Sequence, residues 1–143
     1  MEYRKGAHTL FNIQYHFVWV IKYRYEVLTG EVKVRIRELV RQICDAEEVF
    51  ILKGHVSTDH IHILVSSPPK HSASYLMQKI KGRTSRKIQQ EYPHLRKRYW
   101  GKHIWARGFF CTTVGPMTDE MVKNYIAGHL EKSGDDDFTL DAD

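Results

Sequence analysis

The sequence predicts an α+β domain with a ferredoxin-like (RRM-like) fold, in which an antiparallel sheet carries helices on one face. Three observations lead to this prediction. Four segments alternate apolar with polar residues or are rich in β-branched and aromatic residues, as strands are. Two segments with helical spacing of apolar residues lie after the first and third strands. A further helical segment follows, so the expected order is β-α-β-β-α-β with an additional C-terminal helix.

The first expected strand covers residues 11–21, with Trp19 on one face and His16 on the other. Thr29 is expected to cap the helix that follows it. The apolar residues of that helix recur at helical spacing: Val32, Ile36, Leu39, Val40 and Ile43.

The middle of the chain predicts a hairpin and a second helix. Residues 49–56 and 60–66 read as strands, and their short connection predicts antiparallel pairing. Pro68-Pro69 ends the third strand. Ser72 or Ser74 is expected to cap the second helix. The inner stripe of that helix is Leu76, Ile80, Thr84 and Ile88.

The last third of the chain predicts one strand and one helix. Pro93 ends the second helix, and residues 103–113 have the composition of the fourth strand. Gly115-Pro116 interrupts the chain, and Thr118 is expected to cap the C-terminal helix.

The chain length fits one domain spanning residues 1–143, with an N-terminal extension of about 1–10 and an acidic tail at about 134–143. No apolar run is long enough for a transmembrane helix, and the first residues lack the apolar core of a signal peptide. The expected location is therefore the cytoplasm, without membrane association. Cys44 and Cys111 belong to no paired motif, so we expect reduced thiols.

A net charge of +5 favours a polyanionic partner. Basic residues crowd into one stretch: Lys79, Lys81, Arg83, Arg86, Lys87, Arg96, Lys97 and Arg98. Tyr92, Tyr99 and Trp100 are interleaved or adjacent, which suits a single-stranded or hairpin nucleic acid with bases available to stack. Such a run is otherwise simply a solvated surface. Arg24, at the end of the first strand, is a further candidate for contact with DNA.

His60 and His62 carry the most distinctive pattern in the chain. They alternate with Ile61 and Ile63, so both imidazoles lie on the face opposite the core-facing residues. Two histidines side by side on a strand are good metal ligands if a third group arrives from elsewhere. A His-X-His pair alone is more often an ordinary strand feature. Asp59 either orients one of these histidines or occupies a turn.

Tyr125 and His129 lie four residues apart in the last expected helix, so they are stacked on one helix face. If that helix covers the sheet face bearing the histidine pair, the site gains a phenol and a third imidazole. A tyrosine hydroxyl becomes an effective nucleophile against a phosphodiester when a cation polarises the phosphate. Tyr125 could otherwise be an aromatic packing residue. Tyr23 and Tyr25 are rival nucleophiles, but their position beside basic residues favours contact with DNA or packing.

These residues give the chain a resemblance to single-tyrosine HUH transposases of the TnpA type, found in the smallest bacterial and archaeal insertion sequences. The matching parts are the segment Asp59-His60-Ile61-His62, the later Tyr125, the chain length, and the opening strand from Gln14 to Arg24. The resemblance extends over the chain up to about the acidic tail. The His-hydrophobic-His triplet is weak alone and becomes specific together with the tyrosine helix and the element order.

The resemblance implies a homodimer that binds hairpins of single-stranded DNA at transposon ends. Tyr125 is then the nucleophile that forms a 5′-phosphotyrosine, and His60 and His62 hold a divalent metal, Mg²⁺ or Mn²⁺. Each active site is implied to combine the histidine pair of one subunit with the tyrosine helix of the other. The third ligand in the family is commonly glutamine. Here that position is His129, which is expected to shift preference toward Mn²⁺ or tighter-binding transition metals.

Two other functions are compatible with the sequence. A nickase of the type that initiates rolling-circle replication shares the histidine pair and the later tyrosine. A non-catalytic ferredoxin-like module that binds nucleic acid would use the aromatic strands and basic helix without cleaving DNA.

Overall fold

The structure, a computed structural model, describes residues 3–113 and 119–131, with side chains in the last helix described for Met121 and residues 123–128. The elements in chain order are β1 (Arg4–Lys5), β2 (Leu10–Phe11), β3 (Gln14–Val20), the short 3-10 helix η1 (Lys22–Arg24), α1 (Gly30–Ala46), β4 (Phe50–Val56), β5 (His60–Ser66), α2 (Ala73–Glu91), α3 (Pro93–Arg98), β6 (Phe110–Thr112) and α4 (Asp119–Glu131).

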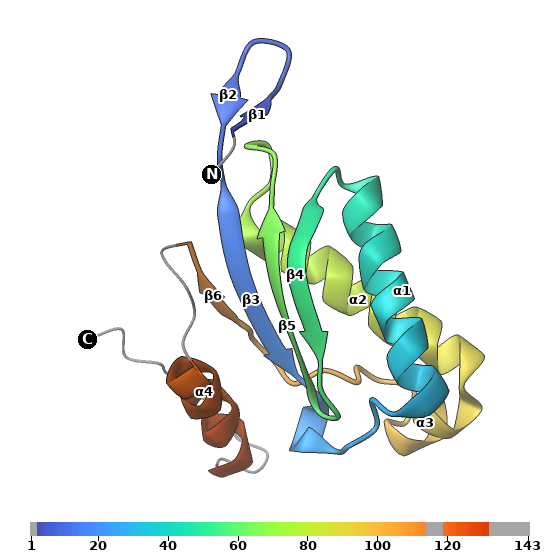
Figure 1. Ribbon diagram of the computed structural model, residues 1–143. Coiled ribbons are helices and arrows are strands. Elements are labelled where there is room, and N and C mark those ends of the chain that lie inside the picture. Colours follow the sequence, from blue (N-terminus) through green and yellow to red (C-terminus); the bar gives the residue numbers. More distant parts are fainter. Residues whose placement is uncertain (1–2, 114–118, 132–143) are drawn as a thin grey trace.

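The main sheet has the strand order β4-β5-β3-β6, and every neighbouring pair is antiparallel. α1 and α2 cover one face of this sheet, while α4 lies against the other (Figure 1). The arrangement confirms the predicted ferredoxin-like α+β fold, with the C-terminal helix on the face that the first two helices leave open.

The larger core lies between the sheet and the two helices. Phe17 and Trp19 of β3 pair with Ile63 and Ile61 of β5, and all four side chains are buried on this face. The predicted helical stripes meet them, since Ile36 and Leu39 of α1 and Leu76, Ile80 and Ile88 of α2 are buried in the same cluster. Because successive strand residues face opposite ways, this burial fixes which residues of β3 and β5 face α4.

Among the described side chains, a smaller apolar cluster lies on the opposite face, where Val18 and Val20 of β3 are completely buried against Tyr125 and Ile126 of α4. Phe110 of β6 packs at its margin. This cluster docks α4 on the sheet of its own chain.

The predicted strands at the two ends of the chain are longer than the observed ones. Residues 11–13 do not continue β3, because Phe11 pairs with Arg4 in a separate two-stranded sheet. Of residues 103–113, only Phe110–Thr112 form β6, and Trp105 makes an isolated bridge to Ile21. Between these points Gly108 has φ of +83°, and Lys81 occupies its carbonyl oxygen, so the ladder does not continue.

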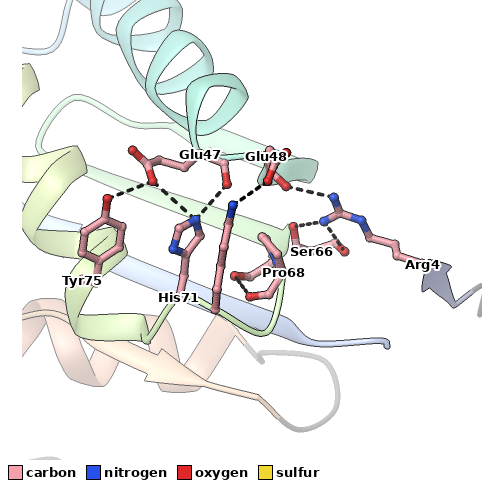
Figure 2. A network of polar contacts seen from close by, with 9 residues as sticks. Arg4, Glu47, Glu48, Ser66, Pro68, His71 and Tyr75 are labelled. Atoms are coloured by element: carbon pink, nitrogen blue, oxygen red, sulfur yellow. Dashed lines mark hydrogen bonds and ion pairs between the residues drawn. The ribbon is translucent and has the colours of Figure 1, made fainter. Parts of the chain in front are cut away.

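A polar network ties β1 to the end of α1 and to the connection that precedes α2 (Figure 2). Arg4 donates to the carbonyl oxygens of Glu48 and Ser66 at 2.9 and 3.0 Å. The Tyr75 hydroxyl donates to Glu47 Oε1 at 3.0 Å. The network lies at the end of β5 opposite the histidine pair, so its role is structural.

The helix ends agree only in part with the sequence prediction. Ser72 caps α2, because its hydroxyl accepts the Tyr75 amide at 3.0 Å. Thr29 precedes α1 as expected, but its side chain makes no capping hydrogen bond. α2 ends at Glu91, and Pro93 then starts α3, a short helix that the sequence analysis did not predict. Within the described ranges, no helix has the length and apolar character needed to cross a membrane.

Replacing Ser72 by alanine is expected to lower the free energy of unfolding by about 1 kcal/mol, because the Tyr75 amide loses its side-chain acceptor. Thr29→Ala is the matched control and should change it by less than about 0.5 kcal/mol. Urea denaturation followed by circular dichroism measures both. Equal losses would contradict this description of the two caps.

Candidate active site

His60 and His62 are half-buried on the face of β5 that α4 approaches. In the antiparallel register, His60 lies directly opposite Val20 of β3 and His62 directly opposite Val18. The two imidazoles therefore share a face and stand beside the valines that hold α4. Strand alternation predicts the shared face, and the register adds the neighbouring residues.

Two further histidines lie close to His62. His55 of β4 is its direct cross-strand partner, and the ring centre of His16 of β3 is 5.8 Å away. Burial and the neighbouring imidazoles and Lys53 lower the pKa of His62. This shift favours the neutral ring, which is the form that binds a metal. From the sequence, His55 could be a fourth imidazole near the pair, although a surface position at the end of its strand is favoured, and His16 has no part in the site. The proximity of both residues to His62 follows only once the register is known.

Asp59 links the histidine pair to the end of β3. Its Oδ1 lies 2.8 Å from His60 Nδ1, and its Oδ2 accepts a hydrogen bond from Arg24 Nε at 3.0 Å. Burial opposes ionisation of Asp59, but the hydrogen bonds from His60 and Arg24 outweigh it and lower the pKa. An ionised carboxylate only accepts, so His60 Nδ1 carries the proton and Nε2 keeps its lone pair for a ligand.

Tyr125 is 2% exposed and packs against Val18 and Val20, the cross-strand neighbours of the two histidines. Phe110 meets the ring edge-on at 5.9 Å between centroids. Burial raises the pKa of the Tyr125 hydroxyl, so the phenol is protonated at neutral pH. The structure thus brings Tyr125 to the same face as His60 and His62.

The third predicted ligand, the His129 side chain, lies outside the described residues, as do the Gly115-Pro116 interruption and the acidic tail. Among the side chains that are described, no three His, Cys, Asp or Glu residues are grouped so as to hold a metal ion. His60 and His62 supply two nitrogen donors, and a metal there needs at least one more protein ligand.

A broad groove of about 1880 Å³ runs along α2 between η1 and the segment leading to β6. Its described lining contains no acidic side chain. The lysines and arginines that line it are Lys22, Arg24, Lys79, Lys81, Arg83, Arg86, Arg96, Lys102 and Arg107. Such a one-signed surface attracts a polyanion and concentrates it along the groove.

Only some of the basic residues predicted to contact DNA line this groove. Of the nine candidates, Lys87, Lys97 and Arg98 are not part of its lining. Arg98 instead lies over the Tyr25 ring, 4.0 Å from its centroid. The sequence analysis missed Lys22, Lys102 and Arg107, which lie outside the dense basic run. The only available signal was that Lys22 and Lys102 lie next to predicted strands, whereas Arg107 lies within the predicted strand 103–113.

Lys81 is held differently from the other groove lysines and arginines. Its Nζ donates to the carbonyl oxygens of Ala106 and Gly108 at 2.9 and 2.7 Å. Burial lowers the pKa of Lys81 to about 8. Lys81 therefore links α2 to the segment before β6. Its presence in the groove lining is explained in part by this structural contact.

Comparisons with known proteins agree over most of the chain. The family model described as "Transposase IS200 like" matches residues 9–129. The ISDra2 transposase TnpA of Deinococcus radiodurans is 29% identical over 132 residues, which cover 92% of this chain and 94% of that protein. The transposase for insertion sequence element IS200 of Salmonella typhimurium is 35% identical over 126 residues, covering 88% and 82%.

Solved structures show the same similarity. A crystal structure of a Deinococcus radiodurans R1 protein described as a transposase superimposes with a TM-score of 0.81 and 27% identity, covering 88% of this chain and 97% of that one. A REP-associated tyrosine transposase bound to a REP hairpin has a TM-score of 0.53 and 16% identity, covering 94% and 81%. The second likeness extends to the fold alone.

Replacing Lys81 by methionine is expected to lower the free energy of unfolding by about 1–3 kcal/mol at neutral pH, because two carbonyl groups lose their donor. Arg86→Met, an exposed neighbour on α2, should change it by less than about 0.5 kcal/mol. Urea unfolding of the three proteins measures the difference.

Wild type and Lys81→Met also test the lowered pKa of Lys81. Its pKa is 10.5 when unfolded and about 8 when folded, so the unfolded state binds more protons between these values. The stability that Lys81 confers is therefore expected to rise from about pH 8 to about pH 10 relative to Lys81→Met. A fall in this stability difference over the same pH range would mean that the pKa of Lys81 is raised on folding, because its hydrogen bonds to the two carbonyl groups stabilise the ammonium form.

Proposed function

The chain belongs to the IS200-like transposase family, and from this premise we propose that it cuts and rejoins single-stranded DNA at insertion-sequence ends with Tyr125 as nucleophile. The observation that carries the proposal is the packing of Tyr125 on Val18 and Val20, the cross-strand neighbours of His60 and His62. A phenol and two imidazoles on one face provide a nucleophile and the beginning of a metal site.

The nitrogen donors fit a divalent ion. His60 and His62 would hold it, with His129 as the third ligand in place of the family's usual glutamine. When bound, Mg²⁺ or Mn²⁺ polarises the scissile phosphate and stabilises the charge that builds on its oxygens. Asp59 holds His60 in the tautomer that leaves Nε2 available. Three imidazoles favour Mn²⁺ or a later transition metal over Mg²⁺.

Attack by Tyr125 forms a bond from its hydroxyl oxygen to phosphorus and releases a 3′-hydroxyl from the cut strand. The product is a 5′-phosphotyrosine, and a second strand's 3′-hydroxyl reverses the reaction to join new ends. The phosphodiester energy is conserved, so no ATP is required.

The buried position of Tyr125 implies that α4 changes place during this cycle. At 2% exposure the side chain is not accessible to a DNA phosphate. We propose that α4 leaves Val18 and Val20 and presents Tyr125 to a histidine pair, which in a homodimer is that of the partner subunit. Docking of α4 on its own sheet is then the resting arrangement.

The basic groove is proposed to hold the DNA. It reaches from Arg24, which is bonded to Asp59, along α2 to Arg96, so a strand lying in it passes close to the histidine pair. A hairpin is the ligand of the REP-associated tyrosine transposase that shares the fold. We propose that a hairpin of single-stranded DNA binds here, with the groove lysines and arginines neutralising its phosphates.

The change Tyr125→Phe is expected to abolish both nicking and the covalent protein–DNA adduct, because phenylalanine lacks the attacking oxygen. Hairpin binding should remain within about twofold of wild type, since the ring still fills the site on Val18 and Val20. A labelled oligonucleotide on a denaturing gel, with Mg²⁺, Mn²⁺ and EDTA, measures all three properties.

Tyr3→Phe is the matched control, because Tyr3 is an exposed tyrosine next to Arg4 of β1. That strand pairs with β2, just before the end of β3 that lies away from the histidine pair. An adduct that persists in Tyr125→Phe would indicate that Tyr23 or Tyr25, and not Tyr125, is the nucleophile. Nicking without strand joining by the wild-type protein would instead indicate an initiator-type nickase, and binding without nicking would indicate a non-catalytic module.

The change Asp59→Asn is expected to weaken divalent-metal binding by about 10- to 100-fold, because His60 loses its charged hydrogen-bond partner. Mn²⁺ titration followed by electron paramagnetic resonance measures the affinity without relying on cleavage. Asp45→Asn, which alters an exposed carboxylate on α1, should leave the affinity unchanged. Unchanged affinity in Asp59→Asn would remove Asp59 from the metal site.

A further inference from the structure

The chain between β3 and α1 contains two consecutive left-handed residues. Tyr23 has φ of +62° and Arg24 has φ of +52°, although neither is glycine, asparagine or aspartate. Residues with a Cβ pay a conformational cost in this region, and such outliers persist only where the surroundings enforce them. The positions at which a fold accepts this cost are often functional.

Backbone hydrogen bonds hold this turn in place on both sides. The amide of Ile21 donates to the Asp59 carbonyl oxygen, and the amide of Lys22 donates to that of Ile104, both at 2.8 Å. The amide of Arg24 closes the turn on the Ile21 carbonyl oxygen, also at 2.8 Å. The turn is therefore fixed to the hairpin of β4 and β5 and to the segment leading to β6.

The consequence of the turn is that two neighbouring side chains point in different directions. Arg24 reaches Asp59, which also bonds His60. Tyr23 points outward and is 59% exposed. The turn thus places the exposed Tyr23 ring next to Arg24. Arg24 is linked to His60, a candidate metal ligand, because both hydrogen-bond to Asp59.

The surroundings of the Tyr23 ring suit a nucleic-acid base. The Tyr25 ring lies 5.5 Å away at 50°, and Arg98 and Tyr99 support Tyr25 in turn. Lys22 Nζ is 5.7 Å from the Tyr23 ring centre. Tyr23 also lines the basic groove, whose described lining carries no acidic side chain. Proteins that bind single strands combine a cationic groove with aromatic rings on which bases stack.

We infer that Tyr23 is a base-stacking residue, which receives an unpaired DNA base next to the phosphodiester that Tyr125 cuts. The inference rests on the proposed function and deepens it, because it assigns the position of a nucleotide relative to His60. Stacking requires the ring and not the hydroxyl. Tyr23 therefore selects for a single strand at the cut and is a binding residue rather than a second nucleophile.

The test uses full-length protein in EDTA, so that no cleavage is needed. The probes are single-stranded oligodeoxynucleotides in which 2-aminopurine is moved one position at a time. Stacking on an aromatic ring quenches its fluorescence. Wild type and Tyr23→Phe are expected to quench the probe at one position, whereas Tyr23→Asn should lose that quenching and bind about 10- to 100-fold more weakly.

Asparagine tolerates the left-handed conformation, so Tyr23→Asn should keep the fold, which its melting temperature checks. Tyr3→Asn is the matched control, since it removes a similarly exposed tyrosine that is not part of the groove lining and should leave quenching intact. A fully paired duplex of the same sequence should show no further quenching at that position when the protein is added, because its bases are already stacked on one another.

Unchanged quenching and affinity in a folded Tyr23→Asn protein would overturn the inference. Equal quenching of the duplex would also overturn it. The proposed function can fail separately: if the wild type never nicks DNA but Tyr23→Asn still loses quenching, the stacking role stands and the transposase chemistry does not.

Discussion

The two-residue period of β5 is the constraint on which the site depends. Ile61, Ile63 and Val65 are buried against α1 and α2, which forces His60 and His62 onto the opposite face. A register slip of one residue would bury the histidines and expose the isoleucines, so the fold cannot change this arrangement without losing its core. The candidate metal ligands are thus positioned by the packing of the residues between them.

The same alternation in β3 places Val18 and Val20 beside the histidines and gives α4 an apolar surface on which to dock. In the part of the chain that the structure describes, this second cluster is smaller than the first. The proposed movement of α4 requires that this cluster open, which separates Tyr125 from Val18 and Val20. The structure therefore combines a histidine pair held on a paired strand with a tyrosine whose own packing keeps it out of contact with solvent.

The sequence was sufficient for the features that depend on local periodicity. β5 begins at His60 and ends at Ser66 as predicted, because alternation defines the strand and Pro68-Pro69 follows it. The inner stripe of α2 is buried as expected. The predicted fourth strand was too long, because the contact of Lys81 with Ala106 and Gly108 is tertiary and leaves no trace in the composition of the segment.

The rest of the site required the strand register and the backbone angles. His16 and His55 approach His62 only through cross-strand pairing, and Arg24 meets Asp59 across 35 residues. The left-handed turn at Tyr23 and Arg24 contains no glycine or asparagine, the residues from which such a turn is usually predicted. Such features arise from several segments at once, so periodicity within one segment cannot predict them.

The proposed chemistry requires that the histidine pair serve a covalent reaction of Tyr125. Peptide mass spectrometry of the protein–DNA adduct, trapped with a hairpin oligonucleotide and digested with protease and nuclease, tests it most directly. We expect a nucleotide linked through its 5′-phosphate to the peptide that contains Tyr125. A nucleotide on a peptide containing Tyr23 or Tyr25 would contradict it.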